Sequence, residues 1–355
     1  MVGALPWLLE AALCPEDGGT LVQDGEGVRC GACEREFAPQ GDVLVLLPDR
    51  LAHVNNVNSV NNLNGPPEPG AHSQDERVRW IEDELAWWNP WHENVSLKPS
   101  SPRAGLRGRS RERNLLRHVR PRLTGEPLAI EMGAGTSRTI AGLWPRGLRY
   151  VATDISLPAL QSGRRILGPE AASVQCDAVA WPFREACADV VLVLGVLHHL
   201  SDWRAALERA CATVRPGGFL LLHEAITKPR VLARFRSHGV DDPWVSPHEG
   251  DVPASALRSE LARYGTIMRW SGEESPLRFA LVRYVIERFG LLDRLETSAA
   301  LTVALNALDQ LWGHTLGRIA PSLGFNEVSV VWQRPAETGA PAGAADAQRR
   351  LRISS

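Results

Sequence analysis

The chain has 355 residues, of which 44% are hydrophobic and 23% charged, as in an ordinary soluble globular protein with room for more than one domain. Its formal net charge of -2 gives no overall attraction to nucleic acid or to an anionic membrane. The sequence contains no run of the roughly 18 apolar residues that a membrane-spanning helix needs, so no span is predicted.

The six cysteines do not follow the pattern of a disulfide framework. Three lie near the N-terminus and three are scattered through apolar segments: Cys14, Cys30, Cys33, Cys176, Cys187 and Cys211. The first residues lack the basic start of a secretion signal, and Glu10 interrupts their apolar run. We therefore expect a protein of the reducing cytoplasm.

The first third of the chain divides into three segments. Residues 1–50 contain short β-like runs, turns and the first cysteines, and are expected to form a small β-rich domain. Residues 51–78 are rich in Asn, Pro and Gly and have few side chains to bury, which predicts a linker. Residues 79–125 are expected to form a helical cap with a tryptophan cluster and an arginine-rich helix.

The tryptophans and arginines of this cap each allow two interpretations. The tryptophans either pack against neighbouring elements or form an aromatic wall of a substrate pocket; they are Trp80, Trp87, Trp88 and Trp91. The eight arginines of residues 103–122 either lie solvated on an amphipathic helix or form a docking site for a phosphate, a carboxylate, a carrier protein or RNA.

Residues 126–225 alternate apolar strands with amphipathic helices. Strands are predicted at 127–132, 149–156, 172–178, 188–197 and 217–225. This alternation implies right-handed crossovers and an α/β fold with a doubly wound, Rossmann-like parallel sheet. Ligands of such sheets bind at the carboxyl ends of the strands, near the switch in strand order.

The residues that follow are expected to complete this domain, which we place at 126–334. Residues 276–322 carry apolar side chains at helical spacing and are interpreted as a helical insertion that caps the pocket. A dimer interface and contact with a membrane surface are the alternatives for this segment. The stretch "NEVSVVW" predicts a last strand, and the small, polar tail 335–355 is expected to be disordered.

The first strand of the core runs into a glycine loop, "EMGAGTS". A strand, a glycine turn and a helix place backbone N–H groups against a ligand, and Gly133 and Gly135 allow the backbone to approach it closely. A dinucleotide site requires a third small residue where Arg138 stands, which argues against NAD. Asp154 ends the next strand, where a carboxylate can bind two ribose hydroxyls, and Asp177 ends the third.

The motifs of residues 126–225 together resemble those of the class I S-adenosylmethionine-dependent methyltransferases. The matching stretches are "EMGAGTS", "ATDIS", "CDAVAWPF", "ADVVLVLGVLHHLSDW" and "VRPGGFLLLHEA", in the family's order. The resemblance implies that the glycine loop holds the methionine end of the donor, Asp154 the ribose and Asp177 the adenine amine. The implied donor-binding residues are Glu131, Gly133, Gly135, Ser137, Asp154, Ile155, Asp177, Ala178, Leu194 and Gly195. Ser137 departs from the family pattern, which usually has a third glycine there.

The resemblance implies methyl transfer from S-adenosylmethionine, and we expect the acceptor to be an O- or C-nucleophile of a small or carrier-bound metabolite. A base would come from the residues that follow the fourth and fifth strands. These are His198, His199, His248 and Glu249, of which His199 and His248 are favoured. The alternative for each histidine is a structural role.

Two other functions stay open. One is a nucleic-acid or protein methyltransferase, although the fourth strand ends in "LGVLHHL" rather than in the Asn/Asp-Pro-Pro-aromatic motif of enzymes that methylate base amino groups. The other is a non-catalytic scaffold that keeps the fold without binding the donor, against which the two strand-end aspartates argue.

The N-terminal cysteines suggest a structural zinc site. Cys30 and Cys33 form a C-x-x-C half-site for tetrahedral zinc, whereas the other half has Cys14 and, in place of a second cysteine, Asp17. The segment resembles the small zinc-ribbon-like domain of the activator subunit of tRNA methyltransferases. Either Asp17 completes a zinc site through an oxygen atom, or the domain is metal-free and held by its apolar strands. A unit of about fifty residues gains from such a staple.

Overall fold

The computed structural model describes residues 6–56, 74–94, 118–137, 148–167, 171–226, 252–273, 299–315 and 327–336, and the single positions Ser246, His248, Gly250, Ser275 and Leu281. Among the helices of these residues, none combines the length and the apolar character that crossing a membrane requires.

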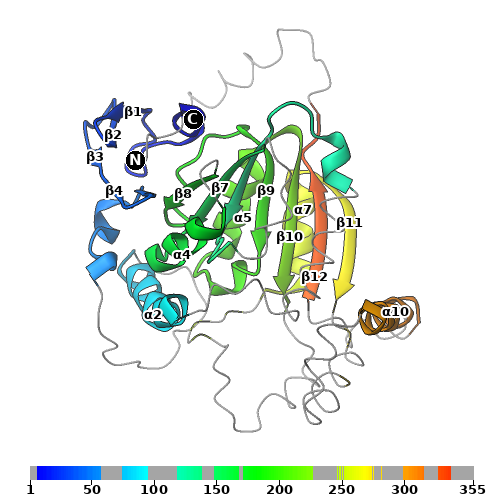
Figure 1. The fold of residues 1–355 in the computed structure, drawn as a ribbon. Coiled ribbons are helices and arrows are strands. Elements are labelled where there is room, and N and C mark those ends of the chain that lie inside the picture. Colours follow the sequence, from blue (N-terminus) through cyan, green and yellow to red (C-terminus); the bar gives the residue numbers. More distant parts are fainter. Residues whose placement is uncertain are drawn as a thin grey trace, which may run out of the picture.

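The large sheet has nine strands in the order β11-β12-β10-β9-β6-β7-β8-β5-β4 (Figure 1). They are β4 (Pro39–Gln40), β5 (Val43–Val45), β6 (Leu128–Met132), β7 (Arg149–Asp154), β8 (Ala171–Gln175), β9 (Ala188–Leu194), β10 (Val214–Ala225), β11 (Thr266–Glu273) and β12 (Glu327–Gln333). From β6 the chain moves outward through β7 and β8, then continues on the other side of β6 with β9 and β10, all parallel. The predicted doubly wound α/β fold is confirmed, and strand order switches between β6 and β9, where such sheets bind ligands.

The core strands and helices follow from their apolar patterns. β9 is apolar almost throughout because the sheet is covered on both faces, and Val190 and Val191 are fully buried. Helices α4 (Leu157–Leu167), α5 (Trp203–Thr213) and α7 (Ala254–Tyr264) pack along these strands. α5 begins after Asp202, whose side chain accepts a hydrogen bond from the N–H of Ala205 at 3.0 Å.

The N-terminal residues form a small unit that is joined to the large sheet. It contains α1 (Pro6–Ala11) and a three-stranded sheet of β1 (Leu21–Asp24), β2 (Gly27–Cys30) and β3 (Glu36–Phe37). The following β4 and β5 belong to the large sheet, where Leu44 pairs in parallel with Val174 of β8. The β structure predicted for this segment is therefore continuous with the sheet of the core.

The segment 51–78, which was expected to be a linker, contains packed structure at both of its described ends. The 3-10 turns η1 (Asp49–Leu51) and η2 (Val54–Asn56) bury Leu51 and Val54 in a cluster with Leu85. Helix α2 (Gln74–Asn94) begins inside the segment. Residues 57–73 lie outside the described part, so the linker prediction applies only to them.

Helix α2 carries the tryptophan cluster and packs beside α4 (Figure 1). Most of the arginine-rich segment lies outside the described residues, which include only its end with η4 (Arg120–Arg122). The described part of the predicted helical insertion is mainly α10 (Ala299–His314), which packs beside β11 at the far edge of the sheet (Figure 1). The tail after residue 336 also lies outside the described part.

Candidate functional site

A cavity of about 230 Å³ lies between α2 and the carboxyl ends of the core strands. Six of the residues predicted from sequence to bind a donor line it: Gly133, Asp154, Ile155, Asp177, Ala178 and Gly195. They come from the ends of four strands, β6, β7, β8 and β9, because parallel strands end on the same edge of a sheet. None of the described side chains of α10 lines this cavity, and among the described residues α2 is the element that caps it.

The glycine loop after β6 has the conformation that the sequence predicts for close approach to a ligand. Gly133 has φ +67°, and a Cβ atom there would lie 2.3 Å from Cγ2 of Val196. Only glycine fits this position. Gly135 has φ +52°, and its N–H donates a hydrogen bond to Oδ2 of Asp154 at 2.8 Å. The loop and the end of β7 are thus fixed to each other.

Ser137 occupies a backbone conformation that usually requires glycine. Its φ is +54°, and its side chain is buried. The loop at this point packs on α4, where a Cβ atom on Gly163 would lie 3.0 Å from the carbonyl carbon of Thr136. The serine is thus accommodated in a left-handed backbone conformation, and Gly163 supplies the space beside the loop.

Asp154 both orders the loop and faces the cavity. Its Oδ1 accepts a hydrogen bond from the N–H of Ser156 at 2.8 Å, while Oδ2 is bound by Gly135. Each carboxylate oxygen has a second lone pair, so the group can also accept hydrogen bonds from a ligand. A cavity with glycine backbone on one side and a strand-end carboxylate on the other can exchange hydrogen bonds with a polar ligand.

Glu131 does not line this cavity. Its side chain is 2% exposed and accepts a hydrogen bond from the hydroxyl of Tyr150 on the neighbouring strand. Burial, together with the Glu131 carboxylate, raises the pKa of Tyr150 well above its usual value. Leu194, Gly135 and Ser137 are also absent from the lining. We interpret Glu131 as a support behind the glycine loop.

Of the two predicted ligand-binding acids that line the cavity, Asp177 is more enclosed than Asp154. It is 4% exposed, and its Oδ1 accepts a hydrogen bond from the N–H of Val179 at 2.9 Å. Its Oδ2 is bound by the guanidinium group of Arg77 on α2 at 2.9 Å, with Arg50 at 4.0 Å. Sequence reasoning missed Arg77, which lies about a hundred residues away in the chain and shares no motif with Asp177.

The ion pair of Asp177 gives a testable prediction for donor binding. We expect Asp177→Asn to weaken S-adenosylmethionine binding about tenfold, because a hydrogen bond to a charged acceptor is lost. The substitution also leaves Arg77 without its anion, so calorimetry should compare it with Arg77→Gln and with the double variant. If the double variant recovers full affinity, the loss in Asp177→Asn comes from Arg77 without its carboxylate partner and not from a lost contact to adenine.

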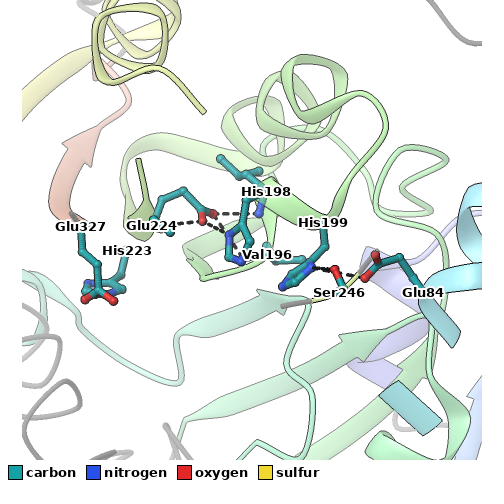
Figure 2. A network of polar contacts seen from close by, with 10 residues as sticks. Glu84, Val196, His198, His199, His223, Glu224, Ser246 and Glu327 are labelled. Atoms are coloured by element: carbon teal, nitrogen blue, oxygen red, sulfur yellow. Dashed lines mark hydrogen bonds and ion pairs between the residues drawn. The ribbon is translucent and has the colours of Figure 1, made fainter. Parts of the chain in front are cut away.

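Two adjacent histidines follow β9 in the turn η5 (Leu197–His199). Nδ1 of His198 pairs with Glu224 at the end of β10 (Figure 2). Glu224 is fully buried and also accepts hydrogen bonds from the N–H groups of Val196 at 3.2 Å and Leu197 at 2.8 Å. Burial would raise the pKa of Glu224, but the His198 charge and these hydrogen bonds together lower it. Glu224 therefore fixes the turn that presents both histidines.

His199 lines the cavity and is held by groups from two other segments. Its Nδ1 lies 3.1 Å from Oγ of Ser246 and 3.3 Å from Oε2 of Glu84 (Figure 2). The ring of Trp88 meets it edge to face at 5.5 Å, and Nε1 of Trp80 donates a hydrogen bond to its carbonyl oxygen at 2.8 Å. Of the predicted bases, His199 is therefore the one that the structure places on the cavity.

His248 lies outside the cavity lining and contacts α2. Its ring stacks on Trp80 with 4.3 Å between ring centroids, and its Nε2 is 2.7 Å from Oδ2 of Asp83. This arrangement favours the structural alternative for His248. Glu249 lies outside the described residues.

The cluster of Cys14, Asp17, Cys30 and Cys33 is assembled in the N-terminal unit. Their potential ligand atoms all lie within 4.8 Å of one another, and the sulfur atoms of Cys14 and Cys33 are 3.7 Å apart. Two sulfur ligands of a tetrahedral zinc ion at about 2.3 Å lie about 3.8 Å apart, so the cluster fits that metal. Burial raises the pKa of Cys14 to about 12, a cost that a bound cation would offset.

The surroundings of the cluster also suit a metal centre. A Cβ atom on Gly19 would lie 2.7 Å from the sulfur of Cys30, so the turn needs glycine there. The N–H of Ala32 donates to the same sulfur at 3.3 Å, and Oδ1 of Asp17 lies 3.4 Å from it. Backbone donors of this kind stabilise a thiolate ligand.

Comparison with known proteins supports the reading of the core. Residues 130–222 match the family model described as a methyltransferase domain. The highly reducing polyketide synthase acrA of Aspergillus aculeatus is 27% identical over 194 residues, covering 50% of this chain and 8% of the synthase. A demethylmenaquinone methyltransferase of Clavibacter sepedonicus is 32% identical over 148 residues, covering 41% of this chain and 60% of that protein. The chain thus spans less than two thirds of these relatives.

Among solved structures, a phosphoethanolamine N-methyltransferase 2 of Haemonchus contortus in complex with S-adenosyl-L-methionine superimposes with a TM-score of 0.46 and 17% identity, covering 75% of this chain and 61% of that one. From the matched family and the fold, residues 130–222 are part of a class I S-adenosylmethionine-dependent methyltransferase domain.

Proposed function

We propose that this protein transfers a methyl group from S-adenosylmethionine to an oxygen or carbon nucleophile of a small or carrier-bound metabolite. The observation that carries the proposal is the cavity at the strand-order switch, where Gly133, Asp154 and Asp177 lie together. Bound there, the sulfonium donor supplies the methyl group and leaves as a thioether. The chain has to position the acceptor, exclude water and remove a proton.

The nature of the acceptor is inferred from the wall opposite the strand ends. This wall is formed by α2, and His199 of η5 beside it is the candidate base. The lining side chains of α2 are the aromatic and apolar Trp80, Ile81, Leu85 and Trp88 and the titratable Arg77, Glu84 and His92. A largely apolar wall beside an imidazole that can accept a proton suits a hydroxyl or an acidic carbon, which must lose a proton when it is methylated. Polyketide synthases and demethylmenaquinone methyltransferases among the relatives favour a metabolite acceptor, free or attached to a carrier.

For the N-terminal unit we propose a structural zinc ion bound by Cys14, Asp17, Cys30 and Cys33. The fit of the sulfur separation and the backbone donor to Cys30 support it. The six cysteines form no disulfide, which agrees with a protein of the reducing cytoplasm.

The donor part of the proposal is tested by calorimetry of the purified chain with S-adenosylmethionine and S-adenosylhomocysteine. We expect micromolar binding of both. If neither compound binds, the result would favour the alternative of a non-catalytic scaffold that keeps the fold without binding the donor.

The histidines give the prediction for the chemical step. His199→Gln should lower methyl transfer to an acceptor that must lose a proton by about 100-fold, the usual contribution of a general base, while donor affinity changes less than about threefold. His198→Gln should also lower the rate, because its pair with Glu224 fixes the turn. Transfer of a tritiated methyl group to acceptors found by screening measures the rate, and half-exposed His53 provides the control His53→Gln. Wild-type rates in His199→Gln would remove it from the mechanism.

A further inference from the structure

The side chain of Glu84, on helix α2, contacts His199, the histidine that lines the cavity. It belongs to α2, is 6% exposed and lies close to Ser246 and His199 (Figure 2). Its Oε2 accepts a hydrogen bond from Nε1 of Trp88 at 3.0 Å and lies 3.3 Å from Nδ1 of His199. A buried carboxylate is costly unless it is paired, and these groups pair Oε2, whereas Oε1 is buried without a hydrogen-bond partner among the described residues.

The environment of Glu84 keeps this group charged. Burial acts to raise its pKa, but the His199 contact, its charge, and hydrogen bonds from Ser246 and Trp88 together lower the pKa below the usual value. A charged carboxylate accepts hydrogen bonds and donates none. Nδ1 of His199 lies 3.3 Å from this carboxylate and 3.1 Å from Oγ of Ser246. Because the Ser246 hydroxyl donates to Glu84, its oxygen is left to accept, and both neighbours favour a hydrogen atom on Nδ1.

A hydrogen atom on Nδ1 determines whether Nε2, the other ring nitrogen, can accept a proton. In a neutral imidazole with Nδ1 protonated, Nε2 has a free lone pair and can accept a proton. The ring position is fixed as well, since Trp88 packs on its edge and Trp80 holds the backbone of the same residue. Both tryptophans and the carboxylate come from α2, so a single helix sets the tautomer and the orientation.

We propose that Glu84 is a positioning residue for His199: it holds Nδ1–H and leaves Nε2 as the acceptor of the substrate's proton. This inference rests on the proposed methyl transfer. As the nucleophile bonds to the methyl group, its proton passes to Nε2, and the resulting imidazolium is stabilised by Glu84 until the proton is released to solvent. The base is complete only when α2 is packed on the sheet, so the same helix that closes the cavity completes the base.

The neighbouring His198 has a different carboxylate partner. Glu224 belongs to β10, whereas the partner of His199 belongs to α2. The centroids of the two rings lie 4.0 Å apart, so changing Glu84 should affect the tautomer of His199 directly and reach His198 only through this contact.

The test is the tautomer of His199, measured by two-bond ¹⁵N–¹H spectra of the full chain labelled with [¹⁵N]histidine, at alkaline pH where the rings are neutral. His199→Gln assigns the signals. We expect His199 of the wild type to carry hydrogen on Nδ1, and Glu84→Ala to shift most of the population to the Nε2–H form that free histidine favours. Glu84→Gln should restore Nδ1–H, because its amide oxygen also accepts a hydrogen bond.

The control lies on the same helix. Glu82 pairs with Nε2 of His53 at 2.7 Å, so Glu82→Ala removes a carboxylate from α2 without touching His199. An Nε2–H tautomer in the wild type, or an unchanged tautomer in Glu84→Ala, would overturn the proposal. The wild-type result stands even where Glu84→Ala fails to fold. Unchanged signals of His223, which is bound to Ser329 and Glu327 of β12, show that the sheet of a variant is intact.

Calorimetry with S-adenosylmethionine on the same samples separates this inference from the proposed function. If the wild type fails to bind the donor while His199 responds to Glu84→Ala as expected, the positioning contact is real and the proposed methyl transfer is wrong. If the donor binds and the tautomer does not respond, the proposed function stands and the role of Glu84 is rejected.

Discussion

Asp154→Ala is expected to weaken binding of S-adenosylmethionine by 100-fold or more. The substitution removes a carboxylate that faces the cavity at the end of β7, where a donor's ribose would lie. Two hydrogen bonds to a charged acceptor contribute roughly 1.5–3 kcal/mol each, and a tenfold change in affinity corresponds to about 1.4 kcal/mol. The loss of the contact to the N–H of Gly135 adds to the effect by loosening the glycine loop. Calorimetry measures the affinity.

The matched control is Asp189→Ala. Asp189 is also bound to backbone, accepting a hydrogen bond from the N–H of Leu128 at 2.8 Å, but it lies at the amino end of β9, away from the cavity. It should change stability and leave donor affinity within about threefold. Asp154→Asn keeps one acceptor oxygen and should show an intermediate loss. Equal affinities for wild type and Asp154→Ala would reject the donor site.

Loss of the N-terminal metal is expected to have the largest effect on stability. We expect the purified chain to contain about one zinc ion, and Cys30→Ser to lose it and to lower the melting temperature by roughly 10 °C. Structural zinc contributes on the order of 10 kcal/mol to the folding free energy of small domains. Because β5 joins the N-terminal unit to β8 of the large sheet, part of this loss should lower the melting temperature of the whole chain. Metal analysis and thermal unfolding of the same samples measure both quantities.

Cys187→Ser serves as the control, since Cys187 is a partly exposed cysteine outside the cluster. It should keep the metal and the wild-type melting temperature. A chain purified without metal, with equal melting temperatures for Cys30→Ser and Cys187→Ser, would favour the metal-free alternative in which the apolar strands alone hold the unit.

The sequence by itself determined the sheet and the side of the cavity that the sheet forms. Alternation of strands and helices predicts parallel strands, and parallel strands bring their carboxyl ends to one edge. Residues directly after consecutive strands must then meet, as Gly133, Asp154, Asp177 and Gly195 do. The four proposed zinc ligands also follow from local spacing, since turns in one small unit bring them together.

Only the tertiary structure decided which side chains face those residues. Arg77 and Glu84 lie on α2, far along the chain from Asp177 and His199, and no local pattern links an amphipathic helix to one edge of a sheet. The structure also shows that two acids predicted by the same reasoning to bind the donor, Glu131 and Asp154, lie in different surroundings. Glu131 lies within β6 and binds the hydroxyl of Tyr150 on the neighbouring strand, whereas Asp154 is the last residue of β7 and lines the cavity. Local sequence sets backbone conformation, but the packing of distant elements selects the partner of each charged group.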